Sequence, residues 1–301
     1  MIELGRSSVQ TWECDTMGHM NVQFYVEKAH DAAGVLGIRL GRGPHAMAEV
    51  KQSLITVDQH VRFHREMRPG TPYFLRGGVA RVEHGQVIAY IEMVQTVGEV
   101  VSATFTSTLQ LRDQQGNTRH PFPTGLARDY IVDIPGYGMA RGLDLDAPPR
   151  RAPTLSEADG MGLMATYMGR VRSQECDRFG RMQARFFMAR YSDSIPNLLA
   201  LTSGRNRGEP GSTGGAALEY RLIYRKFPRA GDILCIRSGL KSIAEKTYVW
   251  AHWMFDAETG ECVATSEAVA VAMDLETRKA IPIPPELRAR LEALRIGGLS
   301  A

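Results

Sequence analysis

The 301-residue sequence predicts an α+β protein built from two copies of one unit, each a long helix followed by a run of strands. An internal repeat is the first sign, because the motif Glu13–Asn21 (ECDTMGHMN) returns as Glu175–Gln183 (ECDRFGRMQ), 162 positions later. The register also holds outside the motif, since Gly78 matches Gly239 at an offset of 161. A period this long indicates duplicated domains rather than a solenoid, whose repeats are far shorter.

Each copy is expected to open with a short strand that leads into the motif, at Ser8–Glu13 and at Val171–Glu175. A long helix follows. In the first copy it is indicated by apolar residues three and four positions apart, at Phe24, Val26, Ala29, Ala33 and Leu36. The second copy of the helix runs from about Ala184 to Leu201. Pro196 predicts a kink or an early end there, because proline has no amide proton to donate.

Four strands are expected after each helix, in segments rich in β-branched and aromatic residues that are separated by Gly, Pro and charged residues. In the first copy they are Ser53–Phe63, Tyr73–Val82, Val87–Thr96 and Val100–Leu111. In the second copy they are Leu218–Tyr224, Ile233–Lys241, Thr247–Phe255 and Cys262–Met273. The helix must bury its apolar face on one side of the antiparallel sheet, which gives the α+β class.

These patterns divide the chain into a domain at 1–125, a linker at 126–154 and a second domain at 155–301. The linker is indicated by the Pro, Gly, Arg and Asp content of Thr124–Ser156. A short helix at Glu157–Tyr167 is expected to open the second copy. The glycine-rich segment Gly204–Gly215 is expected to be a flexible crossover loop rather than a phosphate contact.

Composition excludes several classes of protein. The net charge of +3 is too small to indicate nucleic-acid binding. The sequence contains no run of 18 apolar residues, so we expect no membrane-spanning segment. The four cysteines show no Cys-x-x-Cys spacing, and the first residues have no apolar signal core, so we expect a reducing, cytoplasmic location. His60 and His64 lie about 13 Å apart along a strand, too far for one ion, so we expect neither a metal nor a cofactor.

The stretch Asp15–Asn21 (DTMGHMN), between a short strand and a long helix, resembles the hotdog-fold thioesterases. The likeness is closest to the 4-hydroxybenzoyl-CoA thioesterase and acyl-carrier-protein thioesterase branch, and it extends to the Thr277–Lys279 and Pro282–Pro284 ending. In that fold one long helix is wrapped by an antiparallel sheet, and two units pair edge to edge with active sites at the seam. This chain departs from the family by carrying both units, and by having Arg181 and Gln183 in place of the motif His and Asn. The resemblance therefore implies two tandem hotdog domains, paired as a pseudo-dimer with one active site.

The resemblance also implies an acyl-thioester hydrolase, which acts on acyl-CoA or acyl-carrier protein and releases a free acid and a thiol. Asp15 is the only acid in DTMGHMN, and a carboxylate can attack as a nucleophile or activate water as a general base. Both roles stay open. By resemblance, His19 and Asn21 orient the thioester, the attacking water or Asp15. In the second copy, Asp177 beside Arg181 is expected to be a structural ion-pair partner.

Candidate substrate contacts lie at the helix start, at Val22, Gln23 and Phe24. The backbone N–H groups at this helix start, around Asn21 to Gln23, are left without helical partners and can polarise the thioester carbonyl. A further candidate is Arg225, in a basic cluster before a turn. That cluster is either a solvated edge or a contact for the phosphates of coenzyme A or phosphopantetheine.

Two other functions remain open, because a fold does not determine a function. A hydratase or dehydratase of the same fold pairs an Asp with a His five residues on, and the four-residue spacing from Asp15 to His19 argues against it. A non-catalytic acyl-thioester-binding module would have no need to keep Asp15, His19 and Asn21 together. The expected partners are the thioester substrate and a second copy of the two-domain chain, with no nucleic acid and no membrane.

Overall fold

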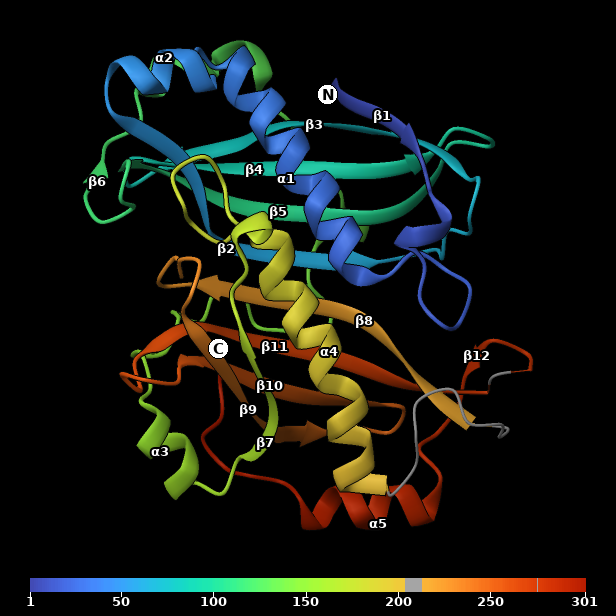
Figure 1. The fold of residues 1–301 in the computed structure, drawn as a ribbon. Coiled ribbons are helices and arrows are strands. Elements are labelled where there is room, and N and C mark those ends of the chain that lie inside the picture. Colours follow the sequence, from blue (N-terminus) through green and yellow to red (C-terminus); the bar gives the residue numbers. More distant parts are fainter. Residues whose placement is uncertain (204–212, 275) are drawn as a thin grey trace. The chain divides into compact units, whose positions relative to one another are not determined.

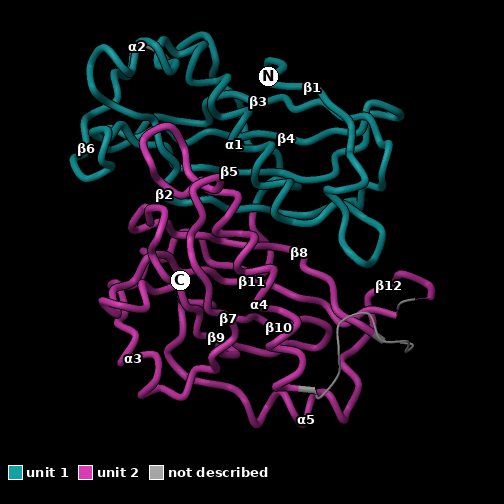
Figure 2. The backbone as a smooth tube through the Cα atoms, viewed as in Figure 1, with its two compact units in different colours: residues 1–139 teal, residues 140–301 magenta. Residues whose placement is uncertain are grey.

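The computed structural model describes residues 1–203, 213–274 and 276–301, which form two compact units, 1–139 and 140–301 (Figure 2). Each unit has one long helix lying on an antiparallel sheet (Figure 1), as predicted for the α+β class. Most of the glycine-rich segment 204–215 lies outside the described residues, and its last two glycines belong to a strand. No helix in the described part of the chain is long and apolar enough to cross a membrane.

In the first unit, five long strands form a sheet in the order β1-β3-β4-β5-β2, with every neighbouring pair antiparallel. The strands are β1 (Ile2–Ser8), β2 (Gln52–Phe63), β3 (Pro72–Glu83), β4 (Gln86–Gln95), β5 (Val100–Asp113) and the short β6 (Arg119–His120) beside β5. The helices are α1 (Val22–Arg39) and α2 (Pro44–Glu49), with 3-10 turns η1 (Thr11–Glu13), η2 (Thr124–Tyr130) and η3 (Gly136–Gly138).

The second unit repeats this arrangement, with a sheet in the order β8-β11-β10-β9-β7. Its strands are β7 (Met164–Arg170), β8 (Thr213–Tyr224), β9 (Ile233–Ile243), β10 (Thr247–Asp256), β11 (Cys262–Asp274) and the short β12 (Lys279–Ala280). Its helices are α3 (Leu155–Gly160), α4 (Ala184–Ser203) and α5 (Pro285–Ala293), with a 3-10 turn η4 (Ser173–Glu175). Pro196 lies inside α4, which continues past it, so the early end allowed by the sequence does not occur.

The long helix of each unit covers one face of its sheet because its apolar stripe is buried there. In α1 the fully buried Val26 and Leu36 lie on this stripe, and Tyr25 packs edge-on against Phe63 of β2 at a centroid distance of 5.3 Å. In α4, Phe187 makes the matching edge-on contact with a β8 tyrosine. Burying each such side chain contributes roughly 1.5–3 kcal/mol, so the stripe holds the helix, and the motif before it, against the sheet.

The approach to the motif differs from the expected strand. β1 ends at Ser8, and Thr11–Glu13 forms a 3-10 turn because the Glu13 carboxylate accepts the backbone N–H of Gln10 at 2.9 Å. The second copy does the same, since Glu175 accepts the N–H of Arg172 at 2.7 Å. The short helix predicted at Glu157–Tyr167 is present only at the start of that segment, since α3 ends at Gly160 and β7 begins at Met164.

Residues 130–139 run over the face of the first sheet that α1 leaves uncovered. The N–H of Val132 donates to the Val79 carbonyl at 2.9 Å, and the Arg62 guanidinium donates to the carbonyls of Tyr137 and Met139, at 2.8 Å each. In the second unit, residues 141–150 are held by β8 in a similar way. The buried Glu219 there accepts the N–H groups of residues 141 and 142. Much of the segment predicted as a linker is therefore fastened to one unit or the other.

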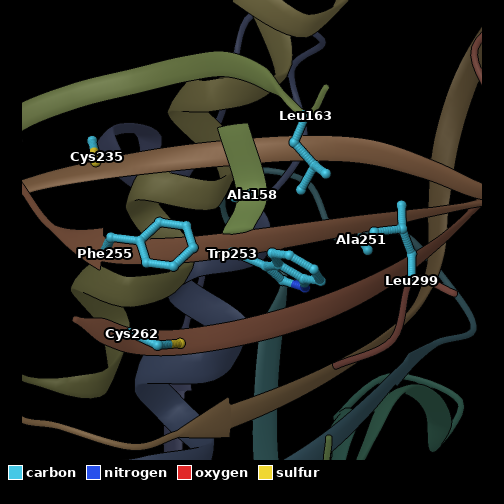
Figure 3. Close-up of a cluster of buried hydrophobic side chains, with 8 residues drawn as sticks. All are labelled: Ala158, Leu163, Cys235, Ala251, Trp253, Phe255, Cys262 and Leu299. Carbon is cyan, nitrogen blue, oxygen red and sulfur yellow. The ribbon is translucent and has the colours of Figure 1, made fainter. Parts of the chain in front are cut away.

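A buried apolar cluster covers the face of the second sheet opposite α4. Its members are Ala158, Leu163, Cys235, Ala251, Trp253, Phe255, Cys262 and Leu299 (Figure 3). The indole N–H of Trp253 donates to the carbonyl of Ser300 at 3.0 Å, which ties the C-terminal residues to this face. Cys235 and Cys262 are buried free thiols here, and burial raises the pKa of Cys262 to about 11. Their packing role agrees with the sequence-based expectation.

Candidate active site

The motif of the first unit is a tight backbone hairpin between η1 and α1. The Asp15 N–H donates to the His19 carbonyl and the Gly18 N–H donates to the Asp15 carbonyl, at 3.0 Å each. Gly18 has a φ of +75°, a conformation that glycine adopts without strain. The Asn21 N–H donates to the Glu13 carbonyl at 2.8 Å, which joins the end of the hairpin to η1. These backbone hydrogen bonds therefore fix the Cα positions from which the side chains of Asp15, His19 and Asn21 extend.

The second unit builds the same hairpin from a different set of side chains. The Asp177 N–H donates to the Arg181 carbonyl at 2.7 Å, and the Gly180 N–H donates to the Asp177 carbonyl at 2.9 Å. The Gln183 N–H donates to the Glu175 carbonyl at 3.0 Å. Since the backbone bonds correspond one to one, the two copies differ in the side chains that the hairpin presents.

In the first copy, the hairpin brings Asp15 and His19 together. Asp15 Oδ1 accepts the Met17 N–H at 2.9 Å and lies 3.5 Å from Nδ1 of His19. The other ring nitrogen, Nε2, lies 3.6 Å from Oε1 of Glu66, so the imidazole sits between two carboxylates. The Asp15 side chain is 10% exposed and that of His19 is 19% exposed. This pair is shielded but still open to solvent, as an attacking group that must meet water or substrate requires.

Glu66 is a site residue that the sequence-based reasoning missed. It reaches the motif because the Met20 N–H donates to the Met67 carbonyl at 2.8 Å, which places the end of the β2–β3 connection beside the hairpin. A comparison of the two copies of the repeat could have identified Glu66. At an offset of 161 the second copy has Phe227 in place of Glu66, so this acid is lost from the second copy together with the motif His and Asn.

Asn21 caps the start of α1. Its Oδ1 accepts the Gln23 N–H at 3.1 Å, and its own N–H is bonded to Glu13. Two of the three amides expected to act as carbonyl donors are therefore already engaged. The Val22 N–H donates to none of the residues that the structure describes, which narrows the expected donor to this amide. Phe24 is buried in the core of the unit.

A buried ion pair supports the hairpin from below. The Glu13 carboxylate is almost fully buried and lies 3.1 Å from Nζ of Lys28, one turn and a half into α1. Burial disfavours the charge on Lys28, but its hydrogen bond with Glu13 and the nearby acid Glu27 raise its pKa overall. The second copy keeps this support as a contact of 2.6 Å between Glu175 and Arg190. The pair therefore serves the fold in both units.

Cys14 is a poorer candidate for the attacking group than Asp15. Burial, together with the neighbouring carboxylates of Asp15 and Glu13, raises the pKa of its thiol above the ordinary value. A thiol held neutral in this way is a poor nucleophile, because the thiolate is the reactive form. The carboxylate of Asp15 is the stronger candidate within the hairpin.

In the second copy, the aspartate is committed to an ion pair. The Arg181 guanidinium donates to Oδ2 of Asp177 through two nitrogens, at 2.9 and 2.8 Å, and its side chain is only 7% exposed. The guanidinium also lies over the ring of Phe179 at 5.0 Å and near that of Phe227 at 5.9 Å. This fork occupies the carboxylate and fills the position that His19 holds in the first copy, as the sequence led us to expect.

Arg225 belongs to the second unit, where its guanidinium is half-buried. It donates to the Arg150 carbonyl at 2.9 Å and to the Thr265 hydroxyl at 3.3 Å. These bonds hold the segment before α3 against β8. A contact between Arg225 and substrate phosphates stays a prediction.

The comparisons with known proteins follow the same repeat. A family model described as the thioesterase-like superfamily matches residues 9–129 and again residues 171–291, which together are most of the chain. Each match contains one copy of the motif hairpin. A search of curated proteins finds no significant match to this sequence.

Solved structures resemble nearly the whole chain at low sequence identity. A protein from Lactobacillus plantarum described as an oleoyl thioesterase is 12% identical, with a TM-score of 0.67, and the match covers 90% of this chain and 96% of that one. An acyl-ACP thioesterase from Bacteroides thetaiotaomicron is 14% identical, with a TM-score of 0.65 and coverage of 88% and 96%. A 12:0-ACP thioesterase from Umbellularia californica is 11% identical, with a TM-score of 0.64 and coverage of 89% and 92%. At such identities these structures establish a shared fold.

Proposed function

The chain belongs to the thioesterase-like superfamily, and from that premise we propose that it hydrolyses acyl-CoA or acyl-carrier protein at a single centre formed by Asp15, His19 and Asn21. The contrast between the two hairpins carries this proposal. One backbone frame occurs twice, and only the first copy leaves its aspartate beside a histidine rather than in an arginine fork. The first unit holds the chemistry, and the second keeps the fold without it.

Hydrolysis of a thioester adds a water oxygen to the acyl carbon and releases the sulfur as a thiol. Asp15 supplies the negative charge for this step, either by attacking the carbonyl itself or by taking a proton from the attacking water. His19, 3.5 Å from Asp15 and 3.6 Å from Glu66, orients the carboxylate and the incoming group. As the carbonyl oxygen gains charge, the Val22 N–H at the positive end of α1 stabilises it. Asn21 caps this helix end and so holds that amide in place.

The identity of the thiol carrier is the finer part of the proposal. Two of the solved structures that share this fold are acyl-ACP thioesterases, which favours acyl-carrier protein over acyl-CoA as the substrate class to test first. Coenzyme A and acyl-carrier protein present the same thioester to Asp15, so the two substrates differ in how the carrier is held and not in the reacting atoms.

Release of free thiol from a panel of acyl thioesters tests the function. Matched acyl groups are offered on coenzyme A and on acyl-carrier protein, and the thiol is traced with a colour reagent. We expect turnover on at least one carrier and none from the Asp15→Asn variant purified in the same way, which controls for contaminating thioesterases. Binding without thiol release would favour a non-catalytic module. Formation of an enoyl thioester, seen by its ultraviolet absorbance, would favour a hydratase or dehydratase.

A further inference from the structure

A row of polar side chains lies buried between α4 and the sheet of the second unit. Ser238, His252 and Ser266 occupy adjacent positions on β9, β10 and β11, since His252 faces Ser238 on one side and Ser266 on the other. Tyr191 of α4 lies against the imidazole, with ring centroids 5.9 Å apart. All four side chains are buried, and His252, Tyr191 and Ser266 are fully so. We call these four residues the inner polar cluster.

Two of the five polar side-chain atoms of the cluster have partners within the protein. The Ser238 hydroxyl shares one hydrogen bond with Nδ1 of His252 and another with the Thr166 hydroxyl, at 2.8 Å each. Nε2 of His252, the Tyr191 hydroxyl and the Ser266 hydroxyl bond to no residue in the described part of the chain.

Three such atoms on neighbouring side chains need an explanation, because buried polar groups in native proteins almost always have a partner. Their clustering matters more than their number. His252 and Ser266 are cross-strand neighbours, and the Tyr191 ring lies against His252, so the three atoms belong to adjacent side chains.

The fold itself does not require polar atoms here. At the same offset of 161, the first unit has Gly77, Ile91 and Phe105 in the corresponding row, and these residues pair across β3, β4 and β5 in the same way. Ala29 of α1 takes the place of Tyr191, at an offset of 162. An apolar row packs against the helix in the first unit, so the polar row is a property of the second unit alone.

The surroundings of the cluster favour an uncharged partner. Burial lowers the pKa of His252 to about 4, so its imidazole is neutral near pH 7. Along β10, the residues that share its face are Trp250 and Met254, and both are buried. An ion placed here would lose its hydration, and none of the four side chains of the cluster carries a charge to compensate it. A neutral oxygen can both accept from and donate to the three open atoms, and an apolar remainder suits the neighbouring side chains.

We propose that the inner polar cluster binds the hydroxyl or carbonyl oxygen of a small, otherwise apolar ligand. Tyr191, Ser266 and Nε2 of His252 contact this oxygen, and Ser238 fixes the orientation of the imidazole through Nδ1. The site lies wholly within the second unit. It stands whether or not Asp15 carries out hydrolysis in the first.

Binding of three probes of nearly equal size to the full-length protein tests the site: hexan-1-ol, hexan-2-one and 1-fluorohexane. Fluorine bonded to carbon is a weak acceptor, so 1-fluorohexane reports apolar binding alone. Imidazole nitrogen shifts are followed in protein labelled with ¹⁵N-histidine, and the His252 signals are assigned from a His252→Gln variant. We expect a saturable shift of the His252 signals with the alcohol and the ketone, and binding about fivefold tighter than for 1-fluorohexane, the factor typical of one net hydrogen bond.

Two variants and one control complete the test. Tyr191→Phe and Ser266→Ala should each bring hexan-1-ol binding down towards that of 1-fluorohexane. Ser194→Ala should leave it unchanged, because the buried Ser194 hydroxyl already donates to the Tyr191 carbonyl at 2.7 Å. Equal binding of the three probes to the wild-type protein, or no saturable shift of His252, overturns the proposal and indicates that the cluster holds water only. The comparison of the three probes is made on the wild-type protein, with His252→Gln used only for assignment, so it stands even if Tyr191→Phe or Ser266→Ala impairs folding.

Discussion

One substitution made in both copies of the motif hairpin separates catalysis from stability. Asp15→Asn keeps the size of the side chain and an oxygen that can accept the Met17 N–H, but it removes the negative charge. We expect kcat/KM to fall by about 10³-fold, within the range for loss of a general base or nucleophile. The free energy of unfolding should change by less than about 1 kcal/mol, because the amide oxygen of the variant can still accept the Met17 N–H.

Asp177→Asn should show the reverse pattern. The substitution removes the charge that pairs with Arg181, whose side chain is only 7% exposed. Breaking a fully buried pair costs about 3–5 kcal/mol, and because Asp177 is 30% exposed we expect a smaller loss of about 2–3 kcal/mol. For a unit of this size that loss lowers Tm by roughly 4–10 °C. Turnover at 25 °C should stay close to that of the wild type.

The assay for this pair of variants combines thiol release with thermal unfolding of each purified protein. Asp15→Asn should lose activity and keep the wild-type Tm, whereas Asp177→Asn should keep activity and have a lower Tm. Equal loss of activity in both variants would refute the single-centre reasoning, because it would give the second hairpin a catalytic part. A large drop in Tm for Asp15→Asn with activity retained would make Asp15 a structural residue.

Three further predictions concern Glu66, Gly78 and the buried histidines His30 and His252. Glu66→Gln should lower kcat/KM about 10- to 100-fold and change its pH profile, because the Glu66 carboxylate lies 3.6 Å from the ring of His19; an unchanged profile would remove Glu66 from the site. Gly78→Ala should lower Tm by several degrees, because a Cβ there would lie 2.4 Å from the Tyr130 carbonyl oxygen; a Tm equal to that of wild type would contradict this packing. Burial lowers the pKa of His30 and of His252 from 6.5 to about 4. Between these values only the unfolded chain takes up the protons, so stability is complete above pH 6.5 and falls as the pH decreases towards 4, by up to about 3 kcal/mol per histidine. Thermal melts from pH 7.5 to 4.5 should show this decline, and a smaller one in His252→Gln; a flat series would contradict it.

The regular elements were predictable because their patterns are local. Segments rich in β-branched and aromatic residues, separated by Gly, Pro and charged residues, predicted the eight strands that follow the two long helices within a few residues, apart from the earlier start of β8. The entry to the motif was predicted as a strand and is a 3-10 turn, because a single side chain decides it. Glu13 folds back onto the N–H of Gln10, and no periodicity reports such a bond. Continuation of α4 past Pro196 was equally beyond a local rule, since tertiary packing of the helix overrides the lost hydrogen bond.

The site was predictable only as far as the motif extends. The resemblance of the Asp15–Asn21 stretch to the hotdog-fold thioesterases implied that His19 acts beside Asp15, and the two side chains lie 3.5 Å apart. Glu66 could not be placed, because its approach depends on the backbone bond between Met20 and Met67, far apart in the sequence. The capping role of Asn21 depends on where the helix begins, and sequence patterns define helix starts poorly. The pairing of the two units into a pseudo-dimer, and of two chains into a homodimer, stay predictions.

The hairpin shared by the two units is held by main-chain hydrogen bonds and by a buried ion pair beneath it, and neither uses the side chains of His19 and Arg181, at which the two copies differ. A change at these positions therefore alters reactivity without requiring the loop to be rebuilt. The substitutions Arg181→His, Gln183→Asn and Phe227→Glu, which restore the residues of the first copy, are therefore expected to leave the backbone of the second hairpin in place.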